Sequence, residues 1–246
     1  MRKFLYLTLI LVLIFPHLVL AATVNESFDN CDGVETLGDA SNCSTGGSGF
    51  SGDWVAVSGD WNASALTCQV ANCVVDSGAT DANATRTFTA KASGANTVYF
   101  SLNDQNTGNA HFAVCKDGFT GSCPDEFNFD LIARRNAFAD VLASDGTGTL
   151  SLGTLTYGTP QKLEFEWGTE NGLSGEAACT AGQVRYSFND ATWSACRNMN
   201  AGNNPGGFDL QRDGSVLITA MFDEIAGTET AAAATAEVPT PIFIDF

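Results

Sequence analysis

The sequence predicts an all-β fold, an antiparallel β-sandwich, on two observations. Gly contributes 25 residues, whereas charged side chains make up only 16% of the chain. Short runs of alternating apolar and polar residues recur between clusters of Gly, Asn, Asp and Ser, which is typical of sandwiches and barrels. No segment keeps a helical period, so no helix is predicted in the domain.

The predicted strands follow one another along the chain. Two runs show the alternation most clearly, with apolar residues at every second position: Val98, Phe100 and Leu102 in one, and Phe127, Phe129 and Leu131 in the other. Further runs lie at 150–157, 183–188 and 215–225. The last run is apolar on both faces, so we expect it to lie centrally in its sheet.

The two ends of the chain differ from this domain. Residues 1–21 begin with a basic segment, continue as an apolar run and end in small residues, as a secretory signal peptide does; an uncleaved membrane anchor is the alternative. Residues 22–227 are assigned to one domain, with no membrane insertion after cleavage. Residues 228–246 are predicted to be an Ala/Thr-rich linker or tail with a short apolar end, which could dock on a sheet edge, serve a partner by strand addition or mark a longer parent chain.

The charge balance limits the possible partners. The chain has 28 acidic residues against 11 Lys and Arg, a formal charge of −17. Binding to nucleic acid or to an anionic membrane depends on Lys and Arg, so neither is expected. Cations, neutral sugars and basic partners remain as candidates.

Eight cysteines in an exported chain predict disulfides. They are spaced as four pairs of near neighbours: Cys31 and Cys43, Cys68 and Cys73, Cys115 and Cys123, and Cys179 and Cys196. We expect each pair to close one local loop. Metal binding is the alternative reading, and it is disfavoured because no C-x-x-C pair occurs and His111 is the only histidine of the mature chain.

Several passages together resemble the concanavalin A-like jelly roll of the laminin-G and glucanase kind. "GDWVAVSGDWNASALTC" at 52–68 is similar to the W-x-V-x-x-G-x-W passage near the start of such domains. The segments 159–172 and 182–193 resemble their pair of strands after a turn, and "MFDEIAG" at 221–227 resembles their closing strand. The resemblance covers most of residues 24–227 and implies a jelly-roll fold.

The resemblance also implies that the first and last strands lie side by side, with a structural calcium ion at their junction. The matching acidic residues here are Glu26, Asp29 and Asp223. Carboxylates that meet without a nearby Lys or Arg repel one another unless a hard cation compensates them. The alternative is that these acids point into solvent.

The segment 160–172 is the strongest candidate for catalysis, because it contains Glu164, Glu166 and Glu170 and glycoside hydrolases use pairs of carboxylates. It is similar to the laminarinase-type signature E-x-D-x-x-E. Here, however, the third carboxylate comes one residue late and follows Gly168, which predicts a turn. Since apolar residues occupy the opposite face of this strand, we interpret Glu164 and Glu166 as its solvated side and predict no catalytic residue.

Carbohydrate recognition would need an aromatic ring on an open face or loop. Trp193 lies on a predicted turn beside Cys196 and is the candidate for stacking on a sugar. Trp167, by contrast, shares a strand face with the apolar residues Leu163 and Phe165, so we expect it to lie in the core. His111 has no nucleophile motif around it, so it is interpreted as a half-exposed strand histidine.

Together these features predict a secreted or cell-surface, non-catalytic, lectin-like module. Its expected partner is an extracellular carbohydrate, and its expected ion is structural calcium. One alternative is a structural or adhesive surface protein that binds another protein. A further alternative is a glycoside hydrolase with an atypical carboxylate pair.

Overall fold

The computed structural model describes the backbone of residues 24–26, 28, 47–59, 61–64, 73–76, 81–102, 108–121, 123, 127–135, 139–200, 204–214 and 220–228. Side chains are described for the same residues except 62–64, 73–76, 135, 214 and 220–228. All of them belong to the unit Thr23–Thr230. The predicted signal peptide and the tail beyond residue 228 lie outside the described residues, so both stay predictions.

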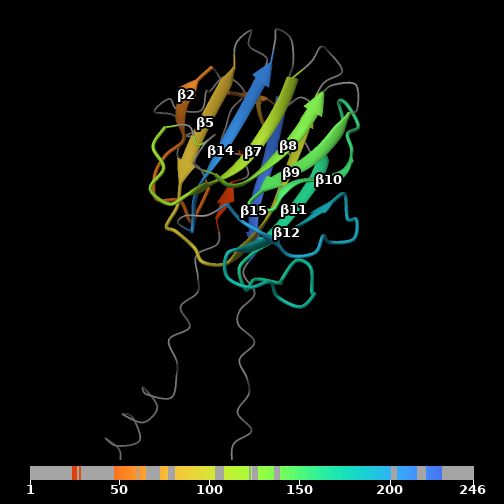
Figure 1. Ribbon diagram of the computed structural model, residues 1–246. Helices are drawn as coiled ribbons and strands as arrows, with labels where there is room; N and C mark the ends of the chain where they lie inside the picture. Colours follow the sequence, from red (N-terminus) through yellow and green to blue (C-terminus); the bar gives the residue numbers. More distant parts are fainter. Residues whose placement is uncertain are drawn as a thin grey trace, which may run out of the picture. The chain divides into compact units, whose positions relative to one another are not determined.

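Within these ranges every element is a β-strand and the paired strands are antiparallel, which confirms the predicted all-β sandwich. Seven strands form the sheet that lies in front in Figure 1. Across this seven-stranded sheet the order is β10 (Gly148–Thr154), β9 (Asp140–Asp145), β8 (Phe127–Arg135), β7 (Gly108–Lys116), β14 (Pro205–Gly214), β5 (Ala82–Thr87) and β2 (Val55–Ser58).

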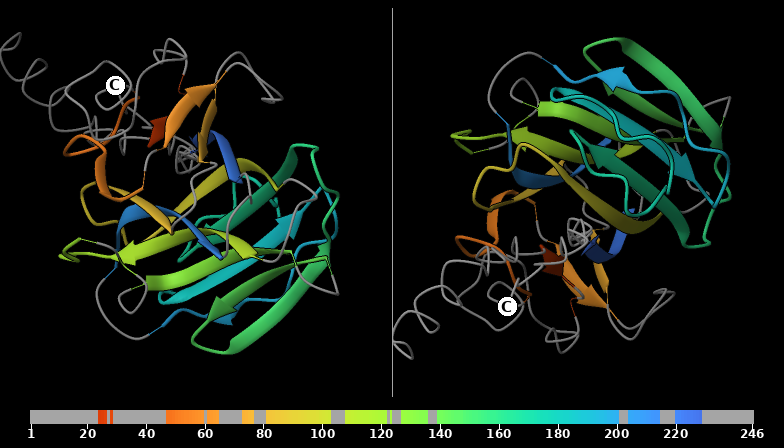
Figure 2. Two further views of the ribbon diagram at one scale, coloured as in Figure 1. Left: turned by 90° about the horizontal axis from the view of Figure 1, so that it is seen from above. Right: turned by 90° about the horizontal axis from the view of Figure 1, so that it is seen from below.

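The second, eight-stranded sheet packs behind the first, and the two layers are seen end-on in Figure 2. Its order is β13 (Arg197–Asn198), β12 (Gln183–Phe188), β11 (Gln161–Trp167), β6 (Gly94–Leu102), β15 (Ala220–Thr228), β4 (Cys73–Asp76) and β3 (Asn62–Ser64), while β1 (Asn25–Glu26) also pairs with β15. As predicted from its two apolar faces, β15 is a central strand. No helix long and apolar enough to span a membrane occurs in the described part of the chain.

Alternate residues of both sheets point inward and form the core between them. Val98, Phe100 and Leu102 are all buried, as the alternation predicts, and so are Phe129 and Leu131. Rings from the two sheets meet in this core: the centroids of Phe129 and Phe165 lie 5.2 Å apart in an edge-on contact, a geometry that aromatic pairs favour.

Phe127 departs from the predicted alternation. The pairing of β7 with β8 shifts register at this point, because Val114 is paired with Phe129 and Cys115 with Phe127. One residue of β8 is therefore extra, and such a bulge turns the side chain before it to the other face. Phe127 packs with Phe119 and the Cys115–Cys123 pair on the outside of the sheet, not in the main core.

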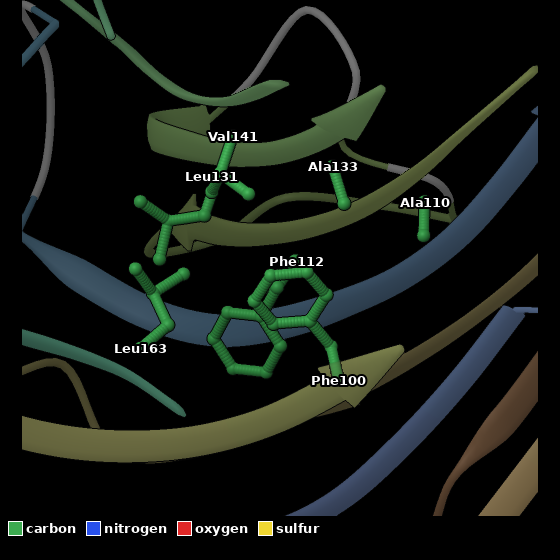
Figure 3. A pocket seen from close by; sticks show the side chains of 7 residues that line it. All are labelled: Phe100, Ala110, Phe112, Leu131, Ala133, Val141 and Leu163. Carbon is green, nitrogen blue, oxygen red and sulfur yellow. The ribbon is translucent and has the colours of Figure 1, made fainter. Parts of the chain in front are cut away.

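A small cavity lies within the core between the two sheets (Figure 3). Its lining is apolar, and the seven side chains converge on it from both sheets: Phe100, Ala110, Phe112, Leu131, Ala133, Val141 and Leu163. Such a void is a packing feature, since none of these side chains could bind a polar ligand or hold a water molecule.

The first and last described strands pair with each other, as the resemblance implies. Asn25 is opposite Ala226 and Glu26 is opposite Ile225. This pairing places the side chain of Glu26 in the interior, where it is 1% exposed, next to the other sheet.

A buried ion pair links β1 of the eight-stranded sheet to β5 of the seven-stranded sheet. The carboxylate of Glu26 accepts hydrogen bonds from the guanidinium of Arg86 and, at 3.1 Å, from Nε1 of Trp54. Arg86 also donates to the carbonyl of Gly52 at 2.9 Å and lies 3.9 Å from the centroid of the Phe50 ring. With Arg86 only 4% exposed, both charges are removed from water and depend on each other.

A second ion pair links the sheets at the opposite edge of the sandwich. Asp145 at the end of β9 accepts hydrogen bonds from Nε of Arg197 at 2.7 Å and from the hydroxyl of Tyr186 at 3.0 Å. Both donors belong to the eight-stranded sheet. The two sheets are thus joined by a charged contact near each edge as well as by the core.

Two of the four predicted disulfides, Cys115–Cys123 and Cys179–Cys196, are formed in the structure. Each closes a local loop, of 8 and 17 residues' separation respectively. The other two predicted pairs include residues outside the described ranges and stay predictions.

We expect Arg86→Leu to lower the free energy of unfolding by about 3–5 kcal/mol, because it leaves the Glu26 carboxylate buried without its cation. Adding Glu26→Gln to this variant should restore part of the loss. Urea denaturation measures both.

Arg134→Leu is the matched control, because Arg134 and its partner Asp140 are 34% and 18% exposed. Its loss should not exceed about 1 kcal/mol. Equal losses for Arg86→Leu and Arg134→Leu would contradict the view that burial makes the Glu26–Arg86 pair essential.

Candidate functional site

The outer face of the seven-stranded sheet carries polar side chains where β8, β7 and β14 run side by side. Four titratable residues of this face lie close together, and we call them the acidic cluster: His111, Asp130, Asp209 and Asp213. Strand pairing brings them together, because Ala113 of β7 is opposite Asp130 on one side and opposite Asp209 on the other. The small side chain of Ala113 therefore lies between the two carboxylates.

The imidazole of His111 lies between two carboxylates. Its Nδ1 is 2.7 Å from Oδ2 of Asp130, and its Nε2 is 3.5 Å from Oδ2 of Asp213. Burial alone disfavours the charged ring, but the two carboxylates outweigh it and raise the pKa of His111 to about 10. His111 is therefore an imidazolium at neutral pH.

Asp209 has no comparable cation. It is fully buried, and its Oδ2 accepts a hydrogen bond from the backbone N–H of Cys123 at 2.9 Å. Burial raises the pKa of Asp209 to about 6, and the nearby charge of Asp130 acts in the same direction. Ionisable groups with shifted pKa values of this kind are concentrated at functional sites.

Two buried carboxylate oxygens of the cluster lack a hydrogen-bond donor. Oδ1 of Asp130 and Oδ1 of Asp209 accept no hydrogen bond from the described residues, although these residues are only 8% and 0% exposed. The buried amide of Asn83 on β5 lies close enough to Asp209 to oppose the rise of its pKa, and the nitrogen and oxygen of this amide also have no hydrogen-bond partner among the described residues. Buried acceptors without a donor are uncommon and costly in folded proteins. The rim of the cluster is more open, since Asn109, Gln211 and Asp213 are all half-buried.

A disulfide-closed loop packs over one end of the cluster. Cys115 and Cys123 form a small apolar cluster with Ala113 and Phe119 on the outer face, beside Asp209. A sulfur of each cysteine and a carboxylate oxygen of Asp209 lie within 4.8 Å of one another. Because the sulfurs are joined in a disulfide, they are not available as thiolates, and this group does not fit a metal site.

Sequence reasoning placed His111 on a strand but missed the cluster around it. Asp130, Asp209 and Asp213 were not singled out, because each stands alone in its own strand. The sequence did contain one signal: in 128–134 and 209–213 most of the residues on the face that points away from the core are polar. Only the pairing of β7 with β8 and β14 shows that these polar faces are neighbours.

The interpretation of Glu166 as a solvated side chain is wrong. Glu166 is 0% exposed and forms an ion pair with Arg185, whose Nε donates to Oε2 at 2.9 Å. Its Oε1 accepts the backbone N–H groups of Leu173 and Ser174 at 2.6 and 2.8 Å, and the Ser174 hydroxyl donates to Oε2 at 2.6 Å. The loop after β11 folds back over the sheet and buries this carboxylate.

The other two carboxylates of the segment also have local partners. Glu164 lies 3.0 Å from Nζ of Lys162 and is mostly buried, which again differs from the predicted solvated face. Glu170 accepts the backbone N–H groups of Asn171 and Gly172 in the turn, and this turn begins at Gly168, as predicted, with a φ of 64°.

The predicted calcium site does not fit Glu26. Its carboxylate is already compensated by Arg86, whereas the prediction assumed that no Lys or Arg was near. Asp29 and the side chain of Asp223 lie outside the described residues. The calcium site therefore stays a prediction for those two residues only.

Trp193 lies in the segment after β12, close along the chain to Cys196, which forms a disulfide with Cys179. Its ring is half-buried and lies 6.0 Å from the guanidinium carbon of Arg185. Trp167, by contrast, is 2% exposed in the core, as predicted. Trp193 and the acidic cluster belong to different sheets, so they are two separate candidate surfaces.

No protein-family model matches this chain, and no curated protein matches it. The structure is similar to that of a sialidase, with a TM-score of 0.57 and 10% sequence identity over 85% of this chain. This chain spans only 19% of the sialidase chain. It is also similar to the β-glucanase of Bacillus licheniformis, with a TM-score of 0.50 and 10% identity over 85% of this chain and 98% of the glucanase. The chain has the concanavalin A-like jelly-roll fold.

The acidic cluster should make stability depend on pH in two separate windows. Protonated His111 stabilises the fold below the unfolded pKa of about 6.5, and this contribution is lost as the pH rises towards the folded pKa of about 10. Neutral Asp209 likewise stabilises the fold at low pH, and its contribution is lost as the pH rises from the unfolded value of about 3.9 through the folded pKa of about 6.

Urea denaturation from pH 4 to pH 10 tests this dependence. We expect His111→Gln to remove a decrease of about 2–5 kcal/mol in the free energy of unfolding between pH 6.5 and pH 10. Asp209→Asn should leave that decrease in place and flatten the curve between pH 4 and pH 6. Parallel curves for the native protein and His111→Gln would contradict the charged state of His111.

Proposed function

We propose that this chain is a secreted or cell-surface carbohydrate-binding module that binds glycans on the outer face of its seven-stranded sheet without cleaving them. One observation carries the proposal: buried carboxylate oxygens that accept no hydrogen bond from the described residues lie on the same sheet face as a half-buried rim of amide and carboxylate side chains. Sugar hydroxyl groups are the complementary donors, and a few convergent polar groups are what fix a ligand's orientation.

The fold supports this class of ligand by analogy. One of the two similar structures is named for glucan as its substrate. At 10% sequence identity, this similarity supports a shared fold but not a shared activity. The acidic cluster is a feature of this chain's own residues, and for that reason it supports the proposal more directly than the likeness does.

Secretion is supported by the basic-apolar-small pattern of residues 1–21 and by the two disulfides of the structure, which persist in oxidising compartments. Calcium remains part of the proposal only through Asp29 and Asp223.

Absence of catalysis is proposed because the two candidate carboxylates, Glu164 and Glu166, are held by local partners. Both oxygens of Glu166 hold hydrogen bonds, and its charge is neutralised by Arg185. A carboxylate held in this way neither protonates a leaving group nor attacks a sugar.

A glycan array probed with the secreted protein tests the proposal, and it should be run in calcium and again in chelator. We expect binding to at least one glycan class, and Asp213→Asn should weaken it about tenfold, as the loss of a charged hydrogen bond implies. Binding that is lost in chelator would support the calcium site; binding that is retained would remove it from the proposal.

Trp193→Ala is the companion variant, because Trp193 lies on the other candidate surface. Retained binding in Trp193→Ala together with loss in Asp213→Asn supports the outer face of the seven-stranded sheet. The reverse pattern would move the site to Trp193. No binding to any glycan would overturn the proposed function and favour a surface role in binding another protein.

A further inference from the structure

The charges on the outer face of the seven-stranded sheet are unbalanced. Arg134 and Asp140 form a closed pair, with Nε and Nη2 of Arg134 at 2.9 and 2.5 Å from the two carboxylate oxygens. Arg212 lies on the opposite face of β14 from the acidic cluster, the face that also carries the core residue Leu210. His111 is therefore the one described cation within the cluster, and three carboxylates surround it.

Burial strengthens the effect of this imbalance. Asp209 is fully buried beside the apolar cluster around Phe119, and Asp130 is 8% exposed. Charges in such low-dielectric surroundings are poorly screened, so their field extends to the nearby surface. The negative potential of these carboxylates is therefore expected to reach solvent at the half-buried rim formed by Asn109, Gln211 and Asp213.

The two oxygens without donors point to the same requirement. Oδ1 of Asp130 and Oδ1 of Asp209 accept no hydrogen bond from the described residues, and His111 already contacts Asp130 and Asp213 through its two nitrogens. These two oxygens lack a donor, although two buried donors beside them, Nε2 of His111 and Nδ2 of Asn83, have no hydrogen-bond acceptor among the described residues either. The three carboxylates of the cluster are also short of positive charge. A neutral hydroxyl supplies a donor alone, whereas an ammonium group supplies a donor and a positive charge.

We infer that this face selects glycans that carry free, protonated amino groups over their neutral or acidic counterparts. The inference rests on the proposed function, because it names the ligand class of the same site. The ammonium group binds at the rim beside Asp213, within the field of Asp130 and Asp209, while the amide of Gln211 donates hydrogen bonds to adjacent hydroxyls and accepts hydrogen bonds from them. An acidic sugar is repelled by the same carboxylates.

A basic peptide would offer the same charge, but the position of the cluster favours a sugar. Peptides that bind sheets add to a free edge through their backbones. The cluster lies on β8, β7 and β14, each of which is paired on both sides. The face thus offers side chains alone, which suits a compact polyhydroxylated ligand.

The test compares two ligands that differ only in charge: an oligomer of glucosamine and the matching oligomer of N-acetylglucosamine. Titration calorimetry at pH 6.5 and low salt should show at least about tenfold tighter binding of the amine form, and about 0.5 M salt should remove most of the preference. Asp209→Asn and Asp130→Asn should each reduce the preference about fivefold to tenfold. Asp190→Asn is the matched control: it removes one equal charge from an exposed turn of the other sheet and should leave the preference unchanged.

The outcomes separate this inference from the proposed function. Equal binding of the two oligomers, or a preference that survives Asp209→Asn and Asp130→Asn, would overturn the inference while the proposed function stands. A lysine oligomer of equal charge that binds as tightly as the amino sugar would also overturn it, since the face would then bind polycations in general. If no glycan on the array bound the protein, the proposed function itself would be overturned. Circular dichroism of each variant establishes that it is folded.

Discussion

The structure depends on how a chain with few cations compensates the carboxylates that it buries. Acidic residues outnumber Lys and Arg by 28 to 11, and a carboxylate inside a protein is costly unless a cation or several donors accompany it. Three arginines each neutralise one buried carboxylate: Arg86 with Glu26, Arg185 with Glu166, and Arg197 with Asp145. These pairs lie where the fold most needs a fixed geometry. Two of them join the sheets, and the third holds the loop after β11 against the sheet surface.

The same pairs determine which surfaces remain available for function. The carboxylate of Glu166 accepts the backbone N–H groups of Leu173 and Ser174, so the loop covers the outer face of β11 at Glu166. The Glu26–Arg86 pair occupies the carboxylate that a calcium ion would have used. Compensation by arginine thus gives a structural role to Glu26, which was expected to bind calcium, and to Glu166, which was expected to face solvent.

The fold could be predicted from the sequence because its determinants are local. The alternation around Phe100 and Phe129 and the spacing of Cys115 and Cys123 depend on residues that are close along the chain. The bulge that turned Phe127 outward and the loop that buried Glu166 depend on pairing with distant strands, which no local pattern records. The acidic cluster belongs to the second kind. Asp130 and Asp209 are 79 positions apart and become neighbours only because β7 lies between their strands.

In the acidic cluster, by contrast, the buried carboxylates are not each paired with a cation of their own. His111 serves two carboxylates at once, and Asp209 has one backbone N–H and no cation. An arginine in place of Gln211 would supply the missing positive charge, since that side chain is half-buried on the same face of β14 as Asp209 and Asp213. The chain pairs Glu26, Glu166 and Asp145 with arginines, yet gives Oδ1 of Asp130 and Oδ1 of Asp209 no hydrogen bond from the described residues, which costs stability at this face. A local loss of stability of this kind is expected at sites that bind a ligand. The missing donors and the missing positive charge then define which groups the ligand has to supply.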